Sequence, residues 1–264
     1  MHWSPAIGSV LSDIEVDHLQ IEAGKKMLHV PSGTARVGQM YDIAYQVVNS
    51  DQVVTVSTTR PETILGDVAV AVHPSDPRYT SLLNEKVLLK HPLREDLIPL
   101  IADADGVDPE LGTGAVKITP NHDFNDFKIA QRLSLPSSII IMDGKGNMTF
   151  PDETESPFQL TPDGKTFLVR RGACCLFSSA QVTLYAEDAC QRPPLLLSLF
   201  CCQLINFLSV LQGLPRFQAR HKVLNYLESK SLLVQVRDHP MSVPICSRSG
   251  DIVEPLPKPQ WFLR

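Results

Sequence analysis

Most of the first 150 positions alternate between hydrophobic and polar residues, in stretches too short for long helices. Successive side chains of a β-strand point to opposite faces, so this pattern is typical of strands with one buried face. It predicts short strands at 12–20, 37–48, 52–59, 66–73, 87–89, 97–101, 115–119 and 138–142, and again at 234–236 and 242–245. The sequence Asn49-Ser-Asp51 separates two of these strands and favours a hairpin.

Two stretches have the apolar spacing of an amphipathic helix instead. One begins after Asp123, a residue type that is preferred as a helix N-cap, and includes Phe127 and Leu133. The other runs from residue 216 to residue 229. Many short strands with few helices predict a β-rich α+β fold, in the form of a small, mostly antiparallel β-barrel decorated with helices.

The stretch from Gly112 to Asp126 combines a glycine turn, a short strand and the start of the first helix. Lys117 lies in the middle of the strand, while Asp123 and Asp126 fall at the N-cap and in the first helical turn. One lysine and two carboxylates therefore meet at a strand-to-helix corner. Helix capping and the helix dipole alone account for the two aspartates about as well as a functional role does.

A second stretch with chemical potential is the β-branched strand that ends in Thr58, Thr59 and Arg60 before Pro61. Its hydroxyls and guanidinium, together with the lysine and the two carboxylates, suit a ligand that carries an ammonium as well as phosphates or hydroxyls. Thr58 and Thr59 point to opposite faces of a straight strand. Both can therefore approach one pocket only if the chain bends before Pro61.

Composition narrows the function classes. The chain has 264 residues, 43% hydrophobic and 20% charged, which is ordinary for a globular protein. A net charge of −5 argues against a free-standing basic nucleic-acid binder. The six cysteines lack zinc-type pairing and a disulfide pattern, so we predict no metal site. The first residues lack the features of a signal peptide, which predicts a cytoplasmic protein and leaves a mitochondrial form open.

Four segments together resemble the valyl-tRNA synthetase family of class I aminoacyl-tRNA synthetases, and specifically its inserted editing domain. They are STTRPETILGDVAVAVHPSDPRY, GTGAVKITPNHDFNDF, GLPRFQAR and CSRSGDIVEPLPKPQWF, and the resemblance covers residues 8–159 and 213–264. It implies a hinge ribbon from the catalytic core at 1–20, an editing domain at 21–159 and 213–250, and a return toward the catalytic core at 251–264.

Residues 160–212 have no counterpart in this resemblance. The apolar run 195–211 is built from residues with pyrimidine-rich codons, as a translated, retained intron would be. Two alternatives are a buried insertion and a membrane span. The seventeen residues of this run lie at the lower limit for crossing a bilayer, and Gln203 and Asn206 count against a span, so no membrane association is predicted.

The resemblance implies an editing hydrolase. A valine pocket rejects threonine poorly, the standard case for this family, so a second site removes threonine from the acceptor end of tRNA(Val). By resemblance, Asp123 binds the ammonium of the threonyl ester, Asp126 assists, and Lys117 lies near the ester. The residues that line the substrate wall would be Thr58, Thr59, Arg60, Gly112 and Thr113.

The same resemblance implies that editing needs no cofactor or metal. ATP and Mg²⁺ belong to aminoacylation by the parent enzyme, whose His-x-Gly-His and Lys-Met-Ser-Lys-Ser sequences do not occur in this chain. Asn121 stands where the family usually has alanine, and His122 is interpreted as scaffold. The alternative function is a catalytically inactive module that binds a tRNA end or a partner, such as the catalytic core of the full-length enzyme.

Overall fold

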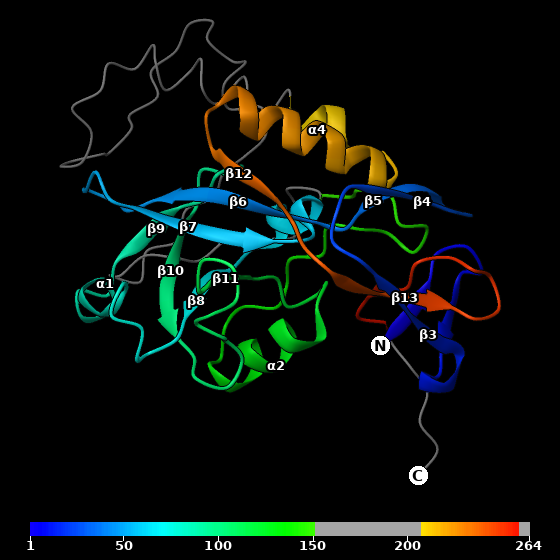
Figure 1. The fold of residues 1–264 in the computed structure, drawn as a ribbon, viewed down its shortest axis with the longest axis horizontal. Coiled ribbons are helices and arrows are strands. Elements are labelled where there is room, and N and C mark those ends of the chain that lie inside the picture. The colour runs from blue at the N-terminus through cyan, green and yellow to red at the C-terminus, as the bar shows by residue number, and fades with distance from the viewer. Residues whose placement is uncertain (151–206, 259–264) are drawn as a thin grey trace, which may run out of the picture.

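The computed structural model describes residues 1–150 and 207–258 (Figure 1). Fourteen strands, two 3₁₀ helices and three α-helices have assigned bounds in this part of the chain. In chain order they are β1 (His2–Ser4), β2 (Ser9–Leu11), η1 (Asp13–Glu15), β3 (Val16–Ile21), β4 (Lys26–Val30), β5 (Gly33–Val37), β6 (Gln39–Gln46), β7 (Val53–Thr58), η2 (Pro61–Gly66), β8 (Ala69–Val72), α1 (Thr80–Asn84), β9 (Leu88–Lys90), β10 (Leu97–Ala102), β11 (Ala115–Ile118), α2 (Phe124–Arg132), α4 (Arg216–Ser229), β12 (Leu233–Asp238), β13 (Met241–Cys246) and β14 (Glu254–Pro255).

The predicted hairpin is confirmed. Strands β6 and β7 pair antiparallel from Tyr41 opposite Thr58 to Gln46 opposite Val53, and Asn49 in the intervening turn has a left-handed φ of 58°. Strand β12 adds to the other edge of β6. Figure 1 shows α4 lying along one side of this sheet, with β8, β11 and α2 on its other side. The threonine-rich end of β7 is therefore held in the middle of the molecule.

The β-rich α+β class is confirmed, but the predicted closed barrel is not. The described strands form five separate sheets of two to four strands. In the four-stranded sheet β11-β8-β10-β9, strands β8 and β10 run parallel. Strands β7 and β11 lie side by side without a backbone ladder. Where they approach each other, the Thr113 amide donates to the side-chain oxygen of Ser57 at 3.1 Å, so the two sheets meet through a side chain.

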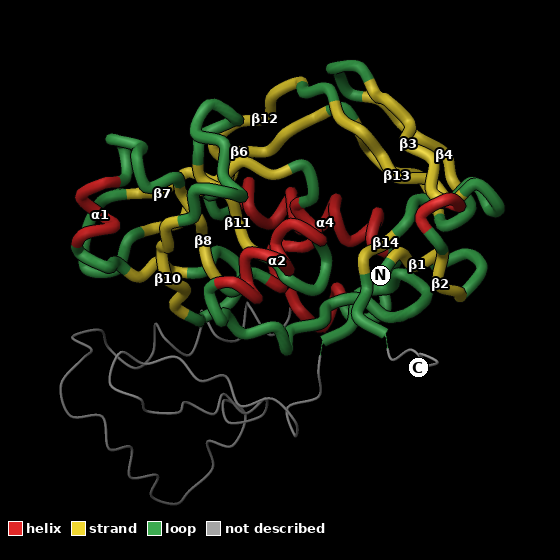
Figure 2. The backbone as a smooth tube through the Cα atoms, turned by 90° about the horizontal axis from the view of Figure 1, so that it is seen from below, coloured by secondary structure: helices red, strands yellow, loops and turns green. Residues whose placement is uncertain are grey.

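The ends of the described chain lie next to each other. Strand β1 pairs with both β2 and β14, and β3 pairs with β13 from Ile21 opposite Met241 to Val16 opposite Cys246. Figure 2 shows β1, β2 and β14 gathered beside the N-terminus. Residues 1–20 are thus woven into two small sheets with the C-terminal strands. Their role as a hinge stays a prediction.

The interpretation of residues 160–212 as a retained intron stays a prediction as well, because residues 151–206 lie outside the described residues. Its described end, 207–212, is helical up to residue 211. Leu211 is fully buried in the main core, and the Phe207 ring stacks on the Tyr226 ring at 4.0 Å. This end therefore packs against α4. Within residues 1–150 and 207–258, the helices are too short or too polar to span a bilayer.

The strand predicted at 138–142 is wrong. This segment forms one isolated bridge, between Met142 and Met148. The Asn121 side-chain amide donates to the carbonyls of Ser137 and Ile139, at 2.8 and 2.7 Å. A ring nitrogen of His122 accepts from the Ile141 amide at 3.1 Å. Side chains thus satisfy backbone groups that a neighbouring strand would otherwise pair.

We expect Asn121→Ala to lower the free energy of unfolding by about 1–3 kcal/mol, because two carbonyls, one of them in a buried bond, lose their donor. Urea denaturation of the purified chain measures this change. Asn125→Ala, at an exposed position of α2, is the matched control and should have little effect. Equal stability of the two variants would contradict the anchoring role of Asn121.

Candidate functional site

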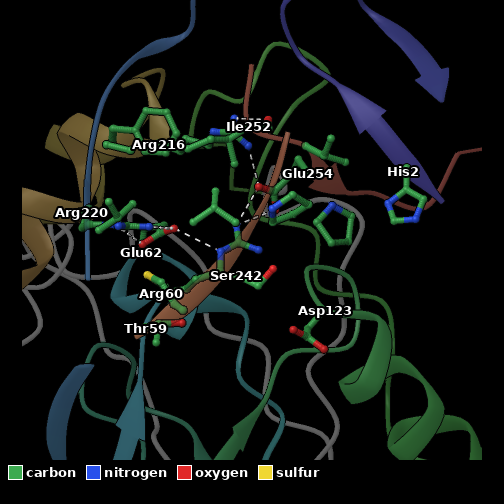
Figure 3. A pocket seen from close by; sticks show the side chains of 18 of the residues that line it. His2, Thr59, Arg60, Glu62, Asp123, Arg216, Arg220, Ser242, Ile252 and Glu254 are labelled. Atoms are coloured by element: carbon green, nitrogen blue, oxygen red, sulfur yellow. Dashed lines mark hydrogen bonds and ion pairs between the residues drawn. The ribbon is translucent and has the colours of Figure 1, made fainter. Parts of the chain in front are cut away.

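A cavity of about 280 Å³ lies where β7, the start of α2, the β3–β13 ribbon, α4 and β14 meet (Figure 3). Its polar side carries Thr59, Arg60 and Asp123 from the two stretches singled out in the sequence. Most of its other lining residues are apolar. The remaining lining residues are His2, His18, Ala35, Val37, Glu62, Phe124, Arg216, Phe217, Arg220, Met241, Ser242, Val243, Pro244, Ile252, Val253, Glu254 and Pro255.

Asp123 is the N-cap of α2, as predicted. Its Oδ1 accepts hydrogen bonds from the amides of Asn125, at 2.8 Å, and Asp126, at 3.2 Å. Both bonds use the same oxygen, and the residue is exposed at the cavity. Figure 3 shows this carboxylate across the cavity from Thr59. The second carboxylate oxygen has no hydrogen bond from any described residue, so the group can accept another donor.

Arg60 lines the cavity but is held by the protein itself. Its Nη2 donates to both carboxylate oxygens of Glu254, at 2.8 and 2.7 Å, and its Nε lies 3.3 Å from Glu62 Oε1. Its Nη1 donates to the carbonyl of His122 at 2.8 Å. Burial lowers the pKa of Arg60, but Glu254 and Glu62 outweigh burial and leave that pKa above its usual value. Its charge is therefore balanced within the protein.

Glu254 is the centre of a buried network. It is fully buried and also accepts from Arg216 Nη1 at 2.7 Å and from His122 Nδ1 at 3.2 Å. Burial raises the pKa of Glu254, but Arg60, His122 and Arg216 together bring it far below its usual range. A parallel arrangement links Arg220 to Glu62 through bonds of 2.7 and 2.8 Å. Both carboxylates thus remain charged and tie α4 to the cavity wall.

Lys117 is not among the residues that line the cavity and lies in a second buried cluster. Its Nζ donates to Thr119 Oγ1 at 2.5 Å and lies 3.4 Å from Asp67 Oδ1. Asp67 also accepts from Thr119 and from the Tyr45 hydroxyl, each at 2.6 Å. Burial is the largest influence on Asp67 and raises its pKa, although Lys117 opposes this shift. The lysine is therefore positioned by a carboxylate that the sequence analysis did not single out.

Asp126 connects this cluster with the helix start. It is buried, and its Oδ2 accepts from the Thr119 amide at 2.8 Å. Burial, and next the charge of Asp123, raise the pKa of Asp126 to about 7, while Lys117 opposes the shift. Asp126 is thus close enough to both Asp123 and Lys117 for their charges to affect its protonation. The structure brings these three residues into one electrostatic group, of which Asp123 faces the cavity.

The remaining predicted residues divide between two sides of β7. Thr58 is buried, and its Oγ1 accepts from the Arg60 amide at 3.0 Å, which bends the chain so that Thr59 reaches the cavity. Gly112 and Thr113 pack against Ser57 away from the cavity lining. Gly112 has a φ of +63°, and an added Cβ would lie 2.6 Å from Ser57 Oγ, so glycine is required there.

Five residues that hold the site together were not predicted from the sequence, namely Glu62, Asp67, Arg216, Arg220 and Glu254. All five occur inside segments already singled out for their resemblance, such as RPETILGD and GDIVEP. Clusters of three or more His, Cys, Asp or Glu suited to a metal ion are absent from residues 1–150 and 207–258.

Comparisons with known proteins identify the family. No protein-family model matches the sequence. The chain is 38% identical over 268 residues to valine–tRNA ligase of Rattus norvegicus and 37% identical to that of Homo sapiens, which covers 100% of this chain and 16% of each relative. It is 37% identical to mitochondrial valine–tRNA ligase of Mus musculus, in a match that covers 100% of this chain and 20% of that relative.

These relatives are aminoacyl-tRNA synthetases. The chain belongs to the valine–tRNA ligase family and spans about a sixth to a fifth of the length of the curated relatives it matches. Among solved structures, the ternary complex of Agrobacterium radiobacter K84 agnB2 LeuRS-tRNA-LeuAMS has a TM-score of 0.32 and 22% identity, over 39% of this chain and 16% of that chain. A likeness at this level carries no argument.

The raised pKa of Asp126 predicts a pH-dependent stability penalty. Below pH 4 the carboxyl is protonated in both the folded and unfolded states, so there is no penalty. Between pH 4 and 7 the unfolded state loses its proton first, which destabilises the folded state increasingly up to about pH 7. Asp126→Asn removes this effect. From pH 4 to pH 8, the stability of the variant relative to the parent should rise by on the order of 2–4 kcal/mol.

Urea denaturation at a series of pH values measures this difference, and the parent serves as reference for all other titrating groups. Asp51→Asn, at an exposed turn position, is the control and should follow the parent at every pH. If Asp126→Asn also follows the parent across this range, Asp126 does not carry the raised pKa.

Proposed function

We propose that this chain carries an editing site that hydrolyses threonyl-tRNA(Val), while the parent enzyme attaches valine to tRNA using ATP. The observation that supports this most is the shared cavity of Thr59, Arg60 and Asp123. These residues come from two segments that lie far apart in the sequence. A hydrogen bond joins the segments, from Arg60 to the carbonyl of His122, 62 residues further along the chain. Both segments also carry the resemblance to the editing domain.

Asp123 is suited to bind the ammonium group of the threonyl ester. Its Oδ1 is occupied by two backbone amides, which fix the carboxylate at the helix start, and it faces the cavity. A bond between a carboxylate and an ammonium is charge-assisted and stronger than a neutral hydrogen bond. The neighbouring arginines Arg60, Arg216 and Arg220 are paired with Glu62 and Glu254 rather than with Asp123, which leaves Asp123 available to the substrate ammonium.

Thr59 gives the same wall a hydroxyl that can exchange a hydrogen bond with the hydroxyl of threonine. Valine has a methyl group at this position and leaves the hydroxyl of Thr59 unpaired. A site built around such a bond discriminates strongly against the analogue that lacks it. Thr59 is therefore proposed to recognise the threonine side chain, with Arg60 shaping the wall between Thr59 and Asp123.

The proposed reaction is ester hydrolysis by a positioned water molecule. Water adds to the ester carbonyl carbon, the bond to the terminal ribose oxygen breaks, and that oxygen takes up a proton, which releases threonine and free tRNA. Neither Lys117 nor Asp126 lines the cavity. The positive charge of Lys117 is proposed to stabilise the carbonyl oxygen as it becomes negative, while Asp126 assists by accepting from the Thr119 amide behind Asp123. This reaction uses no cofactor or metal; ATP and Mg²⁺ serve the parent enzyme.

In the full-length enzyme, the proposed editing domain comprises residues 21–159 and 213–250, with the catalytic core as partner of the flanking segments 1–20 and 251–264. The acceptor end of tRNA(Val) would enter the cavity, whose lining includes the half-buried His2 and the exposed His18. Relatives with and without a mitochondrial designation match the chain, so both compartments fit this proposal.

A second candidate is a module that binds an aminoacylated tRNA end without cleaving the ester. The positions of Lys117 and Asp126 favour it, because both side chains are engaged in buried hydrogen bonds and neither lines the cavity. Binding at Asp123 and Thr59 would persist in such a module. Deacylation of threonyl-tRNA(Val) by the purified chain distinguishes the two functions.

We expect Asp123→Ser to lower kcat/KM for deacylation of threonyl-tRNA(Val) by about 10- to 100-fold, because the substrate ammonium loses its charged partner. Serine is itself a good N-cap, so α2 should keep its capping bond and the chain should stay folded. The measurement is release of threonine under multiple-turnover conditions. Asp51→Asn is the charge-matched control at an exposed turn. A folded Asp123→Ser protein with parental kcat/KM would remove Asp123 from the proposed site.

A further inference from the structure

One buried carboxylate, Glu254, joins the two segments that form the polar side of the cavity. It lies in β14, and its partner Arg60 is 194 residues away in the chain. Arg60 reaches it from the end of the threonine-rich stretch, His122 from the loop that precedes Asp123, and Arg216 from the first turn of α4. Figure 3 shows Glu254 between Arg216 and Arg60.

The hydrogen bonds of His122 fix the tautomer of its ring. Nε2 accepts from the Ile141 amide at 3.1 Å, so this nitrogen carries no proton. Nδ1 must therefore carry the proton and donate it to Glu254 Oε1, at 3.2 Å. Since Arg60 Nη1 also donates to the His122 carbonyl, at 2.8 Å, the ring and the backbone of His122 are both held by the Arg60–Glu254 pair. Asp123 is the next residue along the chain.

We propose that Glu254 is a positioning residue for the editing reaction, which fixes Arg60 and the His122–Asp123 loop relative to each other across the cavity. This inference rests on the proposed function. Glu254 acts through Arg60 and His122, and its effect on the reaction is to keep Asp123 opposite Thr59. The other buried carboxylate of the C-terminal segment, Asp251, accepts from Ser32 at 2.6 Å and lies 4.0 Å from Arg216, without a bond to Arg60 or His122.

The contrast between these two carboxylates defines the experiment. Glu254→Gln keeps the side-chain shape but replaces one accepting oxygen with a donor that faces Arg60, Arg216 or His122. Glu254→Asp keeps the charge and shortens the side chain by one methylene group. Asp251→Asn is the matched control, because it alters a neighbouring buried carboxylate that does not hold the loop. Folding of each variant is checked by thermal unfolding.

The first measurement is independent of activity: the NMR signal of the His122 Nδ1 proton in each folded variant. We expect this signal to move or disappear in both Glu254 variants and to stay at its parental position in Asp251→Asn. The second measurement is single-turnover deacylation of threonyl-tRNA(Val), for which we expect at least a 10-fold slower rate in Glu254→Gln and a rate within twofold of the parent in Asp251→Asn.

A double-mutant cycle then tests whether Glu254 acts through Arg60. If it does, Glu254→Gln combined with Arg60→Lys should be no slower than the slower single variant. A folded Glu254→Gln protein with the parental rate and the parental His122 signal overturns the proposal. The proposal is also overturned if the rate reductions caused by Glu254→Gln and Arg60→Lys multiply in the double variant. If neither Glu254 variant folds, Glu254 is a stability residue and the positioning role is rejected.

If the parental chain does not deacylate threonyl-tRNA(Val), that result counts against the proposed function but does not test the positioning role of Glu254. In that case the NMR signal and binding of a threonyl-adenosine analogue with an amide in place of the ester decide the positioning claim. Weaker binding in Glu254→Gln than in Asp251→Asn, with a changed His122 signal, supports it. Equal binding in the two variants overturns it.

Discussion

The ion pair between Arg60 and Glu254 is the interaction on which the cavity depends. Both carboxylate oxygens of Glu254 accept from the guanidinium of Arg60, and the glutamate is fully buried. Withdrawing such charges from water is costly, and removal of one partner leaves an uncompensated buried charge, at a cost of about 3–5 kcal/mol. The stability of the corner between β7 and η2 is therefore tied to a strand near the other end of the described chain.

The same pairing changes the electrostatic character of the cavity. Arginines 60, 216 and 220 all line it, but Glu62 and Glu254 neutralise much of their charge. Lys117, which the family resemblance implied to lie near the ester, is paired with Asp67 outside the lining. Asp123 is then the exposed carboxylate on the polar side of the cavity. A cationic group on the ligand is better suited to this wall than an anionic one.

Much of the local structure could be predicted from the sequence, because it depends on neighbouring residues. The β6–β7 hairpin, the Asp123 cap and the helix 216–229 follow from alternation, turn residues and apolar spacing. The absence of a strand at 138–142 could not be predicted in this way. Its backbone groups are hydrogen-bonded by the side chains of Asn121 and His122, which lie in another segment of the chain. Likewise, Glu62 and Glu254 are ordinary acidic positions until the fold brings arginines to them.

The site residues that do not line the cavity are explained by the same long-range packing. A strand residue such as Lys117 has two possible faces, and the sequence does not say which face the cavity adjoins. In the structure Lys117 faces Asp67 and Thr119, and Asp126 faces the Thr119 amide. Thr119 thus joins both residues behind the wall that carries Asp123. A charge there still acts on the cavity, because electrostatic interactions are screened less in buried surroundings than in water. The raised pKa of Asp126 is in line with this coupling: burial raises it most, the charge of Asp123 raises it further, and Lys117 opposes the shift.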